Sequence, residues 1–322
     1  MIKESFWKGK RVLVTGADGF IGSHLCDNLL KFGAKVSIFT RYISHPPMPF
    51  FRFRNLEHIR DKFEHIIRGN LGSCETTTLI RKNNPEILFH LGADAYVPHS
   101  FSNPIEVMEA NAMGTLYVLE AAREIDVQQM VCTSSSEMYG PCKGPISEEH
   151  PLYPTSPYAA SKVAADRLSY AYFNTYQLPV AIMRPFNTYG PRHTYDVIPK
   201  FIRLALENKP LTVHGDGKQT RDFAYVDDMI RGFLLMGQEK KARGEAINFG
   251  TGEDVTILDI AKKILAQTGS SSPIKFIEPR TAEVGKLLVD YSKAKRILGW
   301  EPKIFIDEGL KRNIAWAREH ED

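Results

Sequence analysis

The sequence predicts an α/β fold, in which a parallel β-sheet is covered by helices on both faces and is followed by a smaller mixed α/β domain. Short runs rich in β-branched residues alternate with helix-forming segments as far as residue 183, and such alternation is typical of parallel sheets. Beyond about residue 190, prolines and glycines divide the chain into shorter elements. We therefore expect two domains, at residues 1–188 and 189–322, with some exchange of chain between them.

The elements of the first domain follow from the spacing of apolar residues. Residues 23–32 have apolar side chains at helical spacing, and Gly33 is placed to end that helix. Short apolar runs that read as buried strands lie at residues 11–15, 36–39, 87–91, 130–133 and 180–183.

The overall composition excludes several classes of protein. Apolar residues make up 43% of the 322 residues and charged residues 25%, as in an ordinary globular protein. The formal net charge of +3 is too close to balance to indicate a nucleic acid or a membrane surface as partner, and no run reaches the ~18–20 apolar residues of a membrane span. The first eleven residues lack the apolar core of a signal peptide, and the four cysteines lack metal-type spacing. We expect a cytoplasmic protein with reduced thiols and no metal.

A glycine-rich loop, Gly16-x-x-Gly19-x-x-Gly22, joins the first expected strand to the first expected helix. Gly16 permits the tight turn, Gly19 lets the backbone approach a pyrophosphate, and Gly22 lets the helix pack on the sheet. The helix N-terminus adds unpaired N–H groups and the positive end of a dipole. Three glycines alone would indicate only a turn. In this context they predict a dinucleotide site and a Rossmann-type, doubly wound sheet.

The end of the second expected strand bears on the choice between NAD and NADP. An acid there binds the ribose 2′-hydroxyl, whereas a basic residue pairs with a 2′-phosphate. The chain has Thr40-Arg41-Tyr42 at this place, without Asp or Glu, so we expect NADP to be favoured, with NAD possible. The alternative is that Arg41 is a solvated surface residue. Residues 45–51, which contain three prolines, are expected to form an exposed loop near the adenosine end, followed by a short amphipathic helix.

Tyr158 and Lys162 are four residues apart, which places them on one face of a helix. A neighbouring ammonium stabilises a phenolate and lowers the pKa of the tyrosine, so that Tyr158 can take a proton from a sugar hydroxyl. This spacing also occurs by chance on amphipathic helices. The Ser-rich segment Thr133-Ser-Ser-Ser-Glu-Met-Tyr-Gly140 strengthens the functional interpretation, because it follows a strand at the end where α/β sheets place their sites.

The order of glycine loop, Ser-rich strand end and Tyr-x-x-x-Lys resembles the extended short-chain dehydrogenase/reductase family, specifically its NAD(P)-dependent nucleotide-sugar epimerases and dehydratases. The resemblance covers nearly the whole chain and implies an enzyme with a nucleotide-sugar substrate. Further matches are His90-Leu-Gly-Ala93, Asn111-Ala-Met-Gly-Thr115, Arg184-Pro-Phe-Asn-Thr-Tyr-Gly-Pro-Arg192, Arg221-Asp-Phe-Ala-Tyr-Val-Asp227 and Leu298-Gly-Trp300.

The resemblance implies roles for individual residues. Ser135 matches the hydroxyl that binds the substrate O4, Tyr158 the base, and Lys162 the residue that holds both the nicotinamide ribose and the tyrosine. The implied cofactor contacts, with those of the glycine loop, are Gly16, Asp18, Gly19, Phe20, Ile21, Gly22, Thr40, Arg41, Asn70, Leu71, Leu91, Gly92, Ala93, Thr133, Tyr158, Lys162 and Pro185. The implied substrate contacts are Ser135, Ser136, Asn187, Val197, Lys200, Val213, Arg221 and Arg280.

The chain departs from the family pattern at three of these positions. Asn70 stands where the family more often has Asp, and Gly92 replaces a usual Ala. Arg280 is followed by Thr-Ala where the family often has Pro-Gly. For Arg221 and Arg280 the alternative interpretation is a surface ion pair.

Glu137 discriminates between the reactions of the family. A 4,6-dehydratase needs a base for the C5 proton of a transient 4-keto sugar, and a carboxylate suits that task. Glu137 stands where dehydratases of the family carry such a Glu, so we expect a 4,6-dehydratase with Ser135, Glu137, Tyr158 and Lys162 as its catalytic residues. Ser135 is an epimerase-like choice, because dehydratases usually place Thr there, and a 4-epimerase is the alternative.

Two further alternatives have less support in the sequence. A decarboxylase of the family usually has a second Glu between the tyrosine and the lysine, where this chain has Ala159, Ala160 and Ser161. A cofactor-binding protein without activity would lack one of the residues expected to be catalytic. Glu137 itself also has a non-catalytic interpretation, as a helix-capping or solvent-facing carboxylate.

The segments 104–123 and 156–177 contain more apolar and aromatic residues than one covered face needs, among them Tyr170, Tyr172, Phe173 and Tyr176. The resemblance implies a homodimer whose paired helices form a four-helix bundle. Burial of both segments within one subunit is the alternative.

Overall fold

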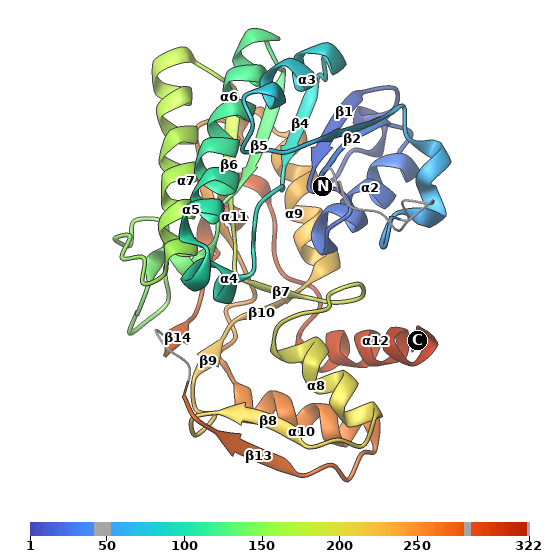
Figure 1. Cartoon of the computed structure of the whole chain (residues 1–322), viewed down its shortest axis with the longest axis vertical. Helices are drawn as coiled ribbons and strands as arrows, with labels where there is room; N and C mark the ends of the chain where they lie inside the picture. The colour runs from blue at the N-terminus through green and yellow to red at the C-terminus, as the bar shows by residue number, and fades with distance from the viewer. Residues whose placement is uncertain (42–52, 280–284, 321–322) are drawn as a thin grey trace.

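The computed structural model describes residues 1–41, 53–279 and 285–320. Within these ranges, seven parallel strands form one sheet in the order β11-β6-β5-β4-β1-β2-β3 (Figure 1). The strands are β1 (Arg11–Thr15), β2 (Lys35–Arg41), β3 (His65–Gly69), β4 (Ile87–His90), β5 (Gln129–Thr133), β6 (Val180–Pro185) and β11 (Ala246–Phe249). The predicted Rossmann-type α/β fold is confirmed.

Helices cover both faces of this sheet, as expected. One face packs against α2 (Phe20–Lys31) and α9 (Val226–Gln238), whose apolar residues share a core cluster with β1 and β4. The other face packs against α3 (Glu75–Asn83), α6 (Gly114–Glu124) and α7 (Pro157–Tyr176). The sheet lies between two apolar layers, which explains why β1, β4, β5 and β6 are almost entirely buried.

The order of the strands determines where a ligand can bind. From β1 the chain proceeds outward through β2 to β3, and then crosses to the other side of β1 to form β4, β5 and β6. The crevice between β1 and β4 at the carboxyl ends of the strands is therefore the topological switch point, where ligands bind in open α/β sheets.

Short connecting elements surround this switch point. Between β4 and α6 lie α4 (Val97–Ser102), α5 (Pro104–Met108) and the π-helical turn η2 (Glu109–Met113). After β5 comes the 3₁₀ turn η3 (Ser136–Tyr139), and η1 (Glu57–Lys62) precedes β3. The helix η1 lies in the part of the chain where a short helix was expected, whereas the proline-rich segment 45–51 falls outside the described residues.

The later part of the chain forms small sheets beyond the carboxyl ends of the central strands (Figure 1). Their pairs are β7 (Asn187–Tyr189) with β10 (Phe223–Tyr225), and β8 (Leu211–His214) with β13 (Ile274–Ile277). A third sheet joins β12 (Val255–Thr256), β9 (Thr220–Arg221) and β14 (Lys286–Leu287). The helices α8 (Val197–Leu206), α10 (Ile257–Thr268) and α12 (Ile306–Glu319) pack beside them, and α1 (Glu4–Trp7) and α11 (Ser292–Leu298) flank the central sheet.

Two strands of the sheet were not expected from the sequence. β3 is a half-exposed edge strand whose His-Ile-Ile-Arg-Gly sequence has only two apolar residues, and β11 comes from beyond residue 188. Within the described residues, no helix has the length and apolar character needed to cross a membrane.

Candidate active site

The glycine loop fits tightly against the end of β4. Gly16 has φ +69°, and a Cβ placed on it would lie 2.7 Å from the backbone of Gly92. A Cβ on Gly22 would lie 2.3 Å from the carbonyl oxygen of Gly16. Any side chain at these two positions would therefore displace the backbone between β1 and α2. The loop forms the narrow backbone cradle that a pyrophosphate needs at the start of α2.

A buried hydrogen-bond chain holds the end of β4 against β1. The Nδ1 atom of His90 lies 2.8 Å from Thr15 Oγ1, and its Nε2 atom lies 3.0 Å from Thr115 Oγ1. The backbone N–H of Gly92 donates to the same Thr15 hydroxyl. Burial lowers the pKa of His90 to about 3, so the ring is neutral and serves as a structural link. This linking role of His90 was not predicted from the sequence, although its place in an apolar strand indicates burial.

The expected adenosine contacts gather at the ends of β2 and β3. Leu71 packs on the end of β4, where a Cβ on Gly92 would lie 2.5 Å from its Cδ1 atom. Gly92 in place of the usual Ala thus makes room for Leu71. Asn70 accepts a hydrogen bond from Gly72 N–H and is bonded through its own carbonyl to Thr76.

Arg41, expected to contact the cofactor, forms an ion pair at the end of β2. Its Nη2 atom lies 2.9 Å from Glu106 Oε1, and both side chains are largely exposed. On the other side of the loop, Asp18 accepts a hydrogen bond from Asn55 N–H and is held next to the segment that follows residue 52.

Tyr158 and Lys162 both lie near the start of α7 and are both buried. Ser156 caps this helix by accepting a hydrogen bond from Ala159 N–H at 3.1 Å, and Pro157 occupies the first helical position. The Lys162 ammonium donates to the carbonyl oxygen of Thr133 at the end of β5, at 2.5 Å. Because α7 begins beside the carboxyl end of β5, the helix brings both side chains to the switch-point edge of the sheet.

The electrostatic environment of Tyr158 differs from the one expected. Burial raises its pKa, a hydrogen bond with Ser135 opposes that rise, and the charges of Tyr195, Glu137 and Asp196 add to it. Burial also lowers the pKa of Lys162. The lowered pKa expected for Tyr158 is not found, because burial is the largest influence on the phenol and raises its pKa.

Glu137 lies in the turn η3, next to Ser135. Ser135 is extended and caps η3 by accepting a hydrogen bond from the backbone N–H of Glu137 at 3.2 Å. β5 ends at Thr133 and the 3₁₀ turn η3 follows, so the cap of this turn, and not a strand, brings Ser135 and Glu137 together. The carboxylate nevertheless lies close enough to Tyr158 for its charge to act on the phenol. Ser136 is buried in the same turn.

A buried ionic network fixes η3 on the sheet. Arg184 of β6 forms two hydrogen bonds to Asp166 of α7, at 2.8 and 2.9 Å, and one to the Tyr139 hydroxyl, at 2.8 Å. Tyr139 in turn donates to Asn248 of β11 at 2.7 Å. The network joins α7, β6, β11 and η3, so it positions the turn that contains Glu137. In the sequence Arg184 is visible only as part of a motif, and this role was not predicted.

The expected substrate residues lie in the later part of the chain. Asn187 is on β7, Val213 on β8 and Arg221 on β9, and the Oδ1 atom of Asn187 is buried without a hydrogen-bond partner in the structure. Val197 and Lys200 belong to α8, whereas Arg280 lies outside the described residues. Immediately before α8, Tyr195 and Asp196 approach Tyr158 closely enough to affect its pKa.

The segment before α8 also contacts the cofactor loop. The ring of His193 stacks on Phe20, the first residue of α2, with ring centroids 4.5 Å apart. Asp196 has φ +75° and Arg192 φ +69°, which are strained conformations for residues other than glycine. Strain of this kind is typical of functional segments, and here it lies between the glycine loop and Tyr158.

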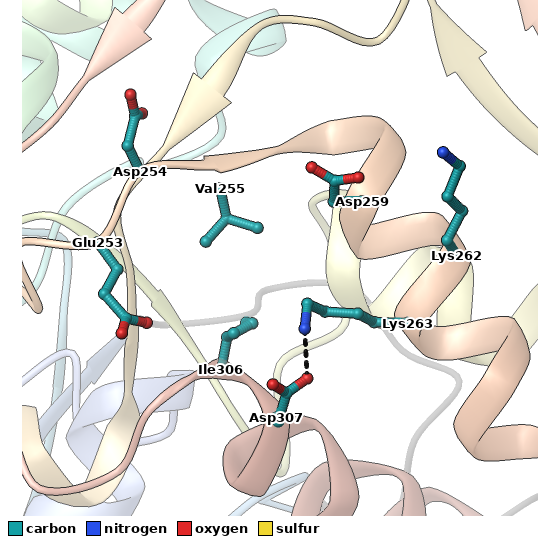
Figure 2. Close-up of a pocket in the computed structure, with 8 residues that line it drawn as sticks. All are labelled: Glu253, Asp254, Val255, Asp259, Lys262, Lys263, Ile306 and Asp307. Carbon is teal, nitrogen blue, oxygen red and sulfur yellow. Dashed lines mark hydrogen bonds and ion pairs between the residues drawn. The ribbon is translucent and has the colours of Figure 1, made fainter.

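A second groove lies away from these residues, between β12, α10 and α12 (Figure 2). Three of the acids that line it have partners, since Lys263 pairs with Asp307 at 2.6 Å, Lys286 pairs with Asp254 and Thr256 donates to Asp259. Among the described residues, no cluster of three or more His, Cys, Asp or Glu side chains is placed to hold a metal ion. The switch-point crevice is therefore the better candidate for chemistry.

Comparison with known proteins gives the same family over the whole length. The profile of the GDP-mannose 4,6 dehydratase family matches residues 13–313. The UDP-glucose 4-epimerase of Mycolicibacterium smegmatis is 34% identical over 316 residues, which are 96% of this chain and 98% of the relative.

Two solved structures resemble this one equally well. DesIV from Streptomyces venezuelae, a dTDP-glucose 4,6-dehydratase with NAD bound, has a TM-score of 0.87 at 30% identity, over 96% of this chain and 97% of its own. The UDP-glucuronic acid 4-epimerase of Bacillus cereus, in complex with UDP-glucuronic acid and NAD, also has a TM-score of 0.87. Its identity is 32%, over 96% of this chain and 99% of its own. Overall similarity identifies the fold and the cofactor class but does not separate the two reactions.

Proposed function

The chain belongs to the NAD-dependent epimerase/dehydratase family of extended short-chain dehydrogenases/reductases, an enzyme family that acts on nucleotide sugars, and within it we propose that this protein is a nucleotide-sugar 4,6-dehydratase. The observation that supports this reaction is the position of Glu137, whose backbone N–H donates to the Ser135 hydroxyl and whose charge acts on the Tyr158 phenol. An epimerase needs no base at this place, whereas a dehydratase needs one for C5.

The proposed division of roles follows the two parts of the chain. Residues 1–188 hold the dinucleotide in the cradle of Gly16 and Gly22, where a Cβ would fill the space. The buried Thr133 Oγ1 atom, which has no partner in the structure, is available to the nicotinamide end. Residues 189–322 bind the nucleotide diphosphate through Arg221 and Arg280, and Asn187, near the end of the first part, is the third proposed contact.

The chemistry of the proposed reaction depends on three side chains. A bound nicotinamide supplies a hydride acceptor for C4 and a hydride donor for C6. Tyr158 takes the proton of the sugar O4, with Ser135 as hydrogen-bond partner of that oxygen. The resulting 4-keto group acidifies C5, and Glu137 takes the C5 proton and transfers it to the C6 hydroxyl, which leaves as water. Ser136 can at most hydrogen-bond the leaving hydroxyl, so Glu137 serves as both base and acid.

The preferred cofactor in this proposal is NAD. The NADP preference expected from Arg41 has no support in the comparisons, because the two similar structures described above contain NAD. Arg41 is also already paired with Glu106. A purified sample that carries predominantly NADP would contradict this part of the proposal.

We also propose a homodimer. Tyr170 and Tyr176 on α7 and Ile105 on α5 are exposed, and α5 packs against α7 at one side of the molecule (Figure 1). Tyr172 and Phe173 instead pack inward against the helical layer, so they do not contribute to the exposed face.

The experiment that tests the reaction uses a panel of UDP-, GDP-, CDP- and dTDP-hexoses. A product lighter than its substrate by the mass of one water indicates a dehydratase. A product of unchanged mass with altered chromatography indicates the alternative, a 4-epimerase, which Ser135 favours because dehydratases of the family usually have Thr at that position.

A further inference from the structure

An acid reaches the end of β2 from a distant part of the chain. The Rossmann fingerprint places a carboxylate there to bind the adenosine ribose, and the sequence around Arg41 has none. In the folded protein Glu106 of α5, 65 residues later, places its Oε1 atom 2.9 Å from Arg41 Nη2. The fold thus supplies from α5 the charge that β2 lacks.

The pair lies at the adenosine end of the switch-point crevice. Arg41 is the last residue of β2, and the neighbouring strand β3 leads into Asn70 and Leu71. The turn η2 directly follows α5 and borders the same loop, since a Cβ on Gly72 would lie 3.2 Å from the Glu109 carbonyl oxygen. The ion pair therefore lies at the end of β2, where the fingerprint locates the ribose.

Glu106 is held by more than Arg41. Its second carboxylate oxygen lies 4.0 Å from His99 Nε2, and His99 Nδ1 lies 2.7 Å from Asp94 Oδ2. The Asn111 side chain bonds both backbone groups of Asp94, at 2.7 and 3.0 Å. This chain of contacts connects Glu106 through His99 and Asp94 to the turn η2, so neighbouring side chains help to position Glu106 although it is partly exposed.

We propose that Glu106 is the residue that sets the preference for NAD over NADP. While it is paired with Arg41, the two charges cancel. The 2′-phosphate of NADP would have to break this ion pair and would then lie beside the negatively charged Glu106 carboxylate. The ribose diol of NAD can instead donate hydrogen bonds from its hydroxyls to that carboxylate. The inference rests on dinucleotide binding, which the family shares, and not on whether the reaction is dehydration or epimerisation.

The experiment measures which dinucleotide the protein holds. Purified Glu106→Gln and wild-type protein are equilibrated with equal concentrations of NAD and NADP, separated from free cofactor, and the bound dinucleotides are quantified by mass spectrometry. We expect the bound NADP-to-NAD ratio to rise about tenfold in Glu106→Gln, because a lone Arg41 then faces the 2′ position. The double variant Arg41→Ala/Glu106→Gln should show no such rise.

A matched control separates this effect from a general change in surface charge. Glu124→Gln breaks a similarly exposed ion pair with Arg81, 2.6 Å long, between α6 and α3. Its NADP-to-NAD ratio should equal that of the wild type. The inference is overturned if Glu106→Gln leaves the ratio unchanged, or if the ratio rises equally in the control or in the double variant. None of these results bears on the proposed dehydration, which is measured separately on the sugar product.

Discussion

Replacing Asp166 with Asn should destabilise the protein strongly, because the carboxylate is the buried partner of Arg184. Both side chains are almost fully buried, and they share two hydrogen bonds of 2.8 and 2.9 Å. Breaking such a pair leaves a guanidinium uncompensated in a medium of low dielectric, which costs about 3–5 kcal/mol. For 322 residues with an unfolding entropy of roughly 2.1 cal/mol/K per residue, the melting temperature should fall by about 4–7 °C.

The assay is thermal or urea unfolding of Asp166→Asn beside Arg167→Ala. Arg167 also bonds Asp166 but is half exposed, so its loss should cost less than about 1 kcal/mol. The reasoning is refuted if Asp166→Asn unfolds like the wild type, or if the two variants lose equal stability.

The same pair gives a pH dependence of known sign. Burial alone would raise the pKa of Asp166, but the hydrogen bonds and the charge of Arg184 outweigh burial and lower it. A depressed pKa in the folded state stabilises the protein at neutral pH, and this contribution is lost as the pH falls through that pKa. Asp166→Asn should therefore reduce the difference in stability between neutral and acidic pH.

Three further predictions concern the site and the assembly. Tyr158→Phe should lower turnover by about 10²–10⁴ while the dinucleotide stays bound, and near-normal turnover would remove Tyr158 as the proton-transfer group. Gly22→Ala should abolish copurification of the dinucleotide, since its Cβ would lie 2.3 Å from the Gly16 carbonyl oxygen; a variant that retains cofactor absorbance would contradict the cradle. Light scattering at micromolar concentration should give the mass of a dimer, and Tyr176→Glu on the exposed face of α7 should shift it toward the monomer.

Local patterns in the sequence were sufficient for much of the fold. The strand β1, the glycine loop and α2 follow from a buried apolar run, three spaced glycines and helical periodicity, all within about 20 residues. The strand β3 was not predicted, because a half-exposed edge strand has too few apolar residues to show the hydrophobic pattern of a strand. The turn η3 was not predicted because it begins where the Ser135 side chain caps a turn beyond the end of β5, and the sequence pattern of a strand does not show such a cap.

The contacts that position the site depend on residues far apart in the sequence. Arg41 forms an ion pair with Glu106, which is 65 residues away in the sequence, and Tyr139 bonds Asn248, which is 109 residues away. These contacts exist only because the fold brings their elements together. A single sequence identifies Arg184 or Arg41 as cations but does not indicate their partners. The expected effect of Lys162 on Tyr158 failed for a related reason, since the degree of burial depends on packing that spacing does not show.

The central claim, that Glu137 is the C5 base of a dehydratase, is tested most directly by turnover in deuterium oxide. The product of the wild-type enzyme should carry deuterium at C5, because C5 regains its hydrogen from solvent after Glu137 has removed the original proton. Glu137→Gln should oxidise C4 and accumulate reduced cofactor without loss of water. A wild-type enzyme that inverts C4 with no deuterium at C5 would be an epimerase, and that result would contradict the role proposed for Glu137.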